Sequence, residues 1–60
     1  MLTPEQLRDI REKITLAEKQ IKEYETDVNN MLRAGISAEA QKAEIARAKD
    51  ALAKLKAVYG

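Results

Sequence analysis

The sequence predicts an all-α protein, an antiparallel two-helix hairpin of the coiled-coil type. Three observations lead to this fold class: a heptad pattern of apolar residues in the first half, a single break around Gly35, and a matching heptad pattern in the second half. We expect one domain over residues 1–60. The first helix should cover about 4–33, the turn 34–37, and the second helix about 38–59.

The first helix has a clear start signal and a long apolar seam. Thr3 is suited to cap the helix, Pro4 to its first position, and Gln6 to the third position of a capping box. No further glycine or proline occurs before Gly35. Along this stretch the apolar residues alternate in steps of three and four, which is the spacing of a coiled-coil seam. They are Leu7, Ile10, Ile14, Ala17, Ile21, Tyr24, Val28 and Met31.

The break lies in the segment Arg33–Ser37. Gly35 fits the left-handed residue that ends many helices, because it has no Cβ to clash in that conformation. Ser37 is suited to cap the second helix, with Glu39 near the positive end of its dipole. A turn this short makes the two helices antiparallel neighbours.

The second helix repeats the heptad spacing, and Ala51 and Val58 widen its apolar face. Its seam is Ile45, Ala48, Leu52, Leu55 and Tyr59. In an antiparallel hairpin, residues whose numbers add up to roughly 70 should face each other. The expected pairs set large residues against small ones. They are Ala17 with Leu52, Ile21 with Ala48, and Tyr24 with Ile45 and Ala46.

The chain is short for a stable single core, and small folds need disulfides, a metal, an oligomer or very good helix packing. There is no cysteine and no histidine, so disulfides and thiolate or imidazole metal sites are excluded. The apolar faces are also wider than one hairpin can cover. We therefore expect a homodimer that forms a four-helix bundle. Its self-association seam is predicted to be Leu7, Ile10, Ile14, Ile21, Tyr24, Val28, Ile45, Leu52 and Leu55.

No pattern of catalytic residues is found, so we expect no enzyme, no cofactor and no metal. Nucleophilic triads need a base beside a hydroxyl or thiol, and Ser37 already has a role as a cap. No glycine-rich phosphate loop occurs. The charges are instead arranged as i,i+4 pairs of opposite sign, which is typical of exposed helix surfaces. These pairs are Arg8–Glu12, Asp9–Lys13, Glu18–Lys22, Lys19–Glu23 and Asp50–Lys54.

A cytoplasmic location is expected, with no membrane contact. No apolar run approaches the length of about 18 residues that a transmembrane helix needs. The segment Met1–Glu5 lacks the basic and apolar regions of a secretory signal. The net charge of +1 gives no general attraction to nucleic acids or anionic lipids.

Two functions remain open. In the first, the chain is a non-enzymatic interaction or regulatory module, and Leu16 and Tyr59 bind a protein partner. Its architecture is similar in shape to the small helical-hairpin dimers that serve as accessory proteins of plasmids and phages, so one version is a phage or bacterial protein that binds or inhibits a host protein.

The alternative is a nucleic-acid-binding bundle that contacts phosphates through basic residues of the second helix. The residues for that function are Lys42, Arg47, Lys49, Lys54 and Lys56. Both tyrosines lie on the apolar seam, which disfavours stacking on bases. A designed or excised coiled-coil segment is a third interpretation, which the irregular positions Thr15, Leu16 and Asn29-Asn30 disfavour.

Overall fold

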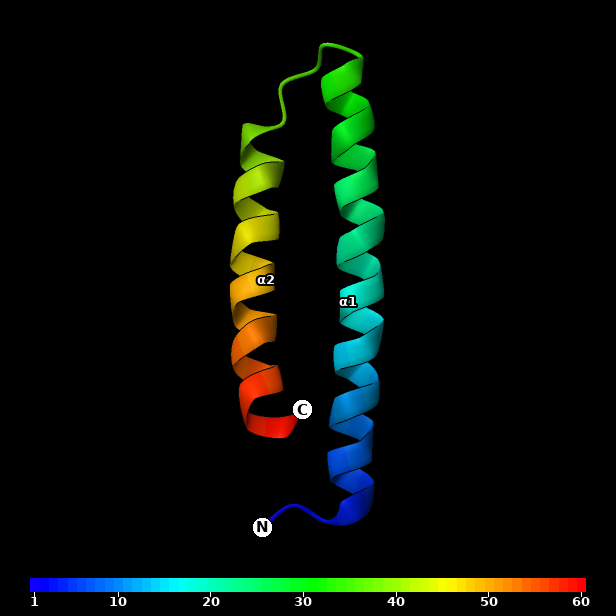
Figure 1. The fold of residues 1–60 in the computed structure, drawn as a ribbon, viewed down its shortest axis with the longest axis vertical. Helices are drawn as coiled ribbons and strands as arrows, with labels where there is room; N and C mark the ends of the chain where they lie inside the picture. Colours follow the sequence, from blue (N-terminus) through cyan, green and yellow to red (C-terminus); the bar gives the residue numbers. More distant parts are fainter.

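The structure is a computed structural model that describes all residues 1–60. It contains two α-helices, α1 over Pro4–Arg33 and α2 over Glu39–Tyr59, and no strand. The helices run antiparallel and pack side by side along the length of α2 (Figure 1). The prediction of an all-helical chain with two helices packed against each other is confirmed. Neither helix contains a stretch long and apolar enough to cross a membrane.

The start of α1 is a complete capping box. The Thr3 hydroxyl accepts a hydrogen bond from the Gln6 backbone N–H at 3.2 Å, and the Gln6 side-chain carbonyl accepts one from the Thr3 N–H at 2.9 Å. Pro4 is the first helical residue, where its missing N–H costs nothing. The capping prediction is therefore confirmed at this end of the helix.

The end of α1 follows the predicted glycine mechanism. Gly35 has a φ of +80°, in the left-handed region. Its N–H donates to the Leu32 carbonyl at 3.1 Å, and the Ile36 N–H donates to the Met31 carbonyl at 2.9 Å. This pair of bonds is the Schellman arrangement, which satisfies carbonyls that the last helical turn leaves free.

The prediction that Ser37 caps α2 is wrong. The capping position is taken by Ala38, and no side chain makes a cap hydrogen bond there. Ala38 is fully buried against Val28 and Ile45. Its methyl group fills the closed end of the hairpin, so packing at this point, rather than capping preference, determines where α2 begins.

The core is small and lies mainly near the turn. Val28, Ala38 and Ile45 form a buried cluster, with Ile21, Tyr24 and Met31 packed against it. Ile14 is the only other buried residue. The molecule measures 48 × 15 × 11 Å, and its radius of gyration is 14.5 Å. A globular domain of this length would have a radius of gyration of about 10 Å, so the hairpin is a rod with little interior.

The longer helix extends beyond the shorter one at the open end. Helix α1 has 30 residues and α2 has 21. The Arg11 Nε donates to the backbone carbonyl of Tyr59 at 2.8 Å, which places the end of α2 beside Arg11. The first turns of α1, including the half-buried Leu7, therefore continue past the end of α2 (Figure 1).

Candidate interaction surfaces

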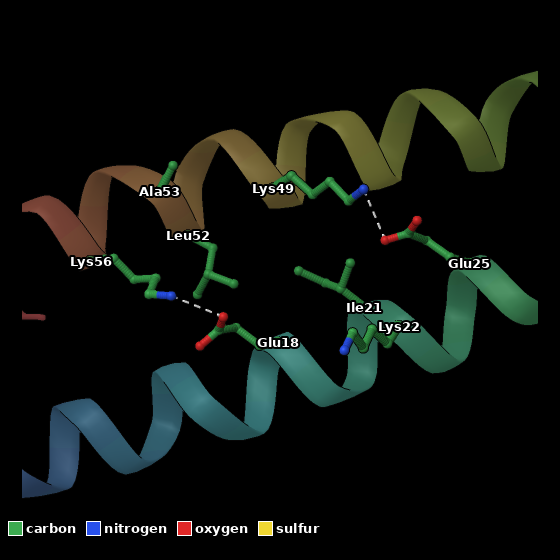
Figure 2. A pocket seen from close by; sticks show the side chains of 8 residues that line it. All are labelled: Glu18, Ile21, Lys22, Glu25, Lys49, Leu52, Ala53 and Lys56. Atoms are coloured by element: carbon green, nitrogen blue, oxygen red, sulfur yellow. Dashed lines mark hydrogen bonds and ion pairs between the residues drawn. The ribbon is translucent and has the colours of Figure 1, made fainter.

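One face of the hairpin is bridged by ion pairs between the helices. Lys49 of α2 contacts Glu25 of α1 at 2.9 Å, and Lys56 contacts Glu18 at 3.0 Å. Figure 2 shows both pairs crossing from helix to helix, with the side chain of Ile21 between them and that of Leu52 beside the Lys56–Glu18 pair. These groups surround a shallow depression of about 340 Å³. We call this side the ion-paired face.

The charge pattern within each helix differs from the prediction. Of the expected i,i+4 pairs, only Asp50–Lys54 forms, at 3.0 Å. Glu18 contacts Lys56 of α2 instead of Lys22. The pairs Arg8–Glu12, Asp9–Lys13 and Lys19–Glu23 do not form, which fits their exposure, because water competes effectively for such surface charges.

The other face is apolar and hollowed between its middle and the open end of the hairpin. Its main hollow has a volume of about 550 Å³, and seven of its eight lining residues are hydrophobic. A second hollow of about 300 Å³ adjoins it toward the open end and shares three of its residues. We call the two together the apolar groove. It is lined by Ile10, Lys13, Ile14, Ala17, Gln20, Ile21 and Tyr24 of α1, and by Ala48, Ala51, Leu52 and Leu55 of α2.

The residues of the predicted self-association seam range from buried to exposed. Three of them are buried, namely Ile14, Val28 and Ile45. Five are half-buried, namely Leu7, Ile10, Ile21, Tyr24 and Leu52. Leu55 is 44% exposed although it lines both hollows of the groove. A single hairpin therefore leaves six of the nine seam residues partly or largely exposed.

Tyr24 brings a polar group to the edge of this groove. Its hydroxyl donates a hydrogen bond to the Glu44 carboxylate at 3.0 Å. Partial removal from water raises the pKa of Tyr24 above its ordinary value, and the hydrogen bond and negative charge of Glu44 raise it further. The bond links α1 to α2 on the apolar side, where no interhelical ion pair is present.

The two residues predicted to bind a protein partner differ in how exposed they are. Leu16 is 54% exposed and lines neither the apolar groove nor the ion-paired depression. Tyr59 is half-buried, and its carbonyl is engaged by Arg11. Of the two, Leu16 is the more accessible apolar side chain.

The basic residues proposed for nucleic-acid contact are largely matched by carboxylates. Four lysines each have one acidic neighbour within 4.0 Å: Lys42 with Glu39, Lys49 with Glu25, Lys54 with Asp50, and Lys56 with Glu18. Arg47 is the member of the set without such a partner. The structure thus does not assemble these residues into a stripe of unpaired cations.

The sequence reasoning missed the contacts between the helices on the ion-paired face. Glu18, Glu25, Lys49 and Lys56 flank the seams at heptad spacing and carry complementary charges. That is the usual signal for interhelical pairing, and it could have predicted the ion-paired face. Gln20 was likewise not singled out, although it lines the apolar groove.

No group of three or more acidic side chains is placed to hold a metal ion. The chain matches no protein-family model, no curated protein and no solved structure. Its function must therefore be inferred from the two faces of the hairpin.

Proposed function

We propose that this chain is a non-enzymatic protein-interaction module of the cytoplasm that works as a homodimer. In the dimer, the apolar groove of each hairpin is covered by a second copy, which completes a four-helix bundle. The observation that carries this proposal is the groove itself. It lies along one side of the interhelical contact, from Ile10 to Tyr24 of α1 and from Ala48 to Leu55 of α2, and is lined almost entirely by aliphatic and aromatic side chains.

The hairpin exposes more surface than a compact protein of its mass, and the excess matches the area that a second hairpin would cover. The chain exposes 4897 Å². A compact globular protein of 6.7 kDa would expose about 3,900 Å². The excess of about 1,000 Å² is close to the roughly 800 Å² that each partner buries in a stable protein interface. A second copy on the groove would therefore bring the exposed area of each chain near that of an ordinary folded domain.

A protein partner would then bind the surface that the bundle leaves free. Leu16 is the candidate anchor, because it is an exposed leucine that lines none of the hollows of the hairpin. The concrete version of this function is a small phage or bacterial accessory protein that binds or inhibits a host protein. The lysine pairing described above makes nucleic acid the less favoured ligand.

The test compares Leu16→Glu with Thr26→Glu, which adds the same charge at another exposed position of α1. Both variants should remain dimers by light scattering at micromolar concentration. A protein retained by the wild type from the lysate of its native host should be lost with Leu16→Glu and kept with Thr26→Glu. Equal retention by the two variants would contradict the role of Leu16. Retention of DNA or RNA that disappears steeply with salt would instead favour the nucleic-acid alternative.

A further inference from the structure

We infer that the second copy is seated with its α1 antiparallel to the α1 of the first copy. The two-fold axis then crosses the groove at right angles to the helices, between Ala17 and Tyr24. This arrangement places α1 against the partner's α1 and α2 against the partner's α2. The inference rests on the dimer proposed above and adds the contacts that define its geometry. The competing dimer has its axis parallel to the helices and places α1 against the partner's α2.

The unequal lengths of the helices distinguish the two dimers. The first turns of α1, with Leu7, continue past the end of α2 near Arg11. If α1 lay beside the partner's α2, the first turns of α1 in both chains would project from the same end of the dimer. Neither would then have a neighbouring helix. If α1 lies along the partner's α1, the Leu7 end of each chain meets the Arg33 end of the other. Only that arrangement covers the extension and its apolar side chains.

The apolar stripe of α1 is complementary to itself about this axis. Ile10, Ala17, Tyr24 and Met31 are spaced by heptads, so they share one side of the helix. A two-fold interface pairs residue i with residue j and j with i. An axis between Ala17 and Tyr24 therefore sets each Ala17 against the partner's Tyr24, and each Ile10 against the partner's Met31. The large ring of Tyr24 then meets the smallest residue of the stripe, as close packing requires.

Polar residues lie beside this stripe, and their charges are complementary to those of the partner across the two-fold axis. Lys13 and Gln20 line the groove, and Asp27 lies one heptad further along the same side of α1. Neither Lys13 nor Asp27 has an ion-pair partner within the chain. The same axis passes beside Gln20 and brings each Lys13 toward the partner's Asp27. Two charges that are unpaired in the hairpin thus acquire partners in the dimer.

Helix α2 is compatible with the same axis. Ala51 lines the groove across from Gln20, and its small side chain allows the two α2 helices to approach closely. At the outer edge, Arg47 comes near the partner's Lys54. That lysine is already neutralised by Asp50 at 3.0 Å, and its side chain is 78% exposed, so screening keeps the repulsion small.

Cysteine cross-linking tests the geometry, because the natural chain has no cysteine. Gln20→Cys and Ala51→Cys are each oxidised alone and as a mixture, and the products are identified by mass spectrometry. A disulfide needs Cα atoms closer than about 7 Å, so only positions near a shared axis or in direct contact can link. We expect each variant alone to form a disulfide dimer, and the mixture to give no product that joins the two variants.

Two other outcomes overturn the inference in different ways. If the mixture links the Gln20→Cys variant to the Ala51→Cys variant and neither links to itself, α1 lies beside the partner's α2, and the proposed dimer survives with the other axis. If the unoxidised variants and the wild type are monomers by sedimentation, the proposed function fails along with the geometry.

Charge reversal provides a second readout that needs no disulfide. Lys13→Glu should weaken the dimer roughly tenfold, because both copies then oppose like charges at the rim. The double change Lys13→Glu and Asp27→Lys should restore the wild-type affinity, since it reverses the sign of both partners. A double variant as weak as the single one would contradict the pairing of Lys13 with the partner's Asp27.

Discussion

Replacing Leu55 by alanine should weaken the dimer while leaving the hairpin helical. Leu55 lines both hollows of the apolar groove and is 44% exposed in the single hairpin. Full burial of a leucine side chain contributes about 1.5–3 kcal/mol, so covering the exposed part of Leu55 contributes roughly 1 kcal/mol per chain. Two copies give about 2 kcal/mol, which corresponds to a dissociation constant roughly 30-fold higher in the variant.

Leu16→Ala is the matched control for this experiment. It makes the same chemical change at a leucine of similar exposure, 54%, that lies outside the groove. Leucine and alanine both favour helix, so neither change should reduce the helical signal in circular dichroism. Dissociation constants from sedimentation equilibrium should rise about 30-fold for Leu55→Ala and much less for Leu16→Ala. The reverse pattern would refute the assignment of the groove as the interface.

Three further predictions concern the turn, the seam and the tyrosine. Gly35→Ala should lower the free energy of unfolding in urea titrations by roughly 1 kcal/mol, because Gly35 has a φ of +80°. No atom lies within 4 Å of an added Cβ, so the cost comes from the backbone conformation and not from a steric clash. An unchanged urea midpoint would contradict this. Ile21→Asp places a charge between the helices and should unfold the protein or dissociate the dimer, whereas an unchanged assembly would contradict the heptad assignment. In a Tyr59→Phe background, absorbance titration should place the pKa of Tyr24 above its ordinary value of about 10, and Glu44→Gln should lower it. Because folding raises the pKa of Tyr24, stability should be lost as the pH rises above about 10. If Tyr24 instead titrates at its ordinary pKa, the contact with Glu44 is refuted.

The ends of α1 could be predicted from the sequence because local chemistry determines them. Thr3 and Gln6 form a capping box whose bonds lie within four residues, Pro4 follows the cap, and Gly35 supplies a conformation that other residues avoid. The start of α2 could not be predicted in this way. It depends on Ala38 packing against Val28 of the other helix and Ile45 of its own, which is a contact between helices and not a local capping bond. Ser37 was the better cap by residue type, but packing outweighed that preference.

The candidate surfaces could be predicted only in part. The heptad pattern placed the apolar residues on a seam, but a seam has two sides, and periodicity alone does not show which side the partner helix covers. The ion pairs Lys49–Glu25 and Lys56–Glu18 close one side, and the apolar groove remains open on the other. Sequence reasoning weighed charges within each helix and so missed these contacts between helices.

Sedimentation equilibrium of the unmodified chain at micromolar concentration tests the central claim most directly. We predict a species of twice the 6.7 kDa chain mass that dissociates on dilution, because the apolar groove is covered by a second copy. A stable species of 6.7 kDa at every concentration would contradict it.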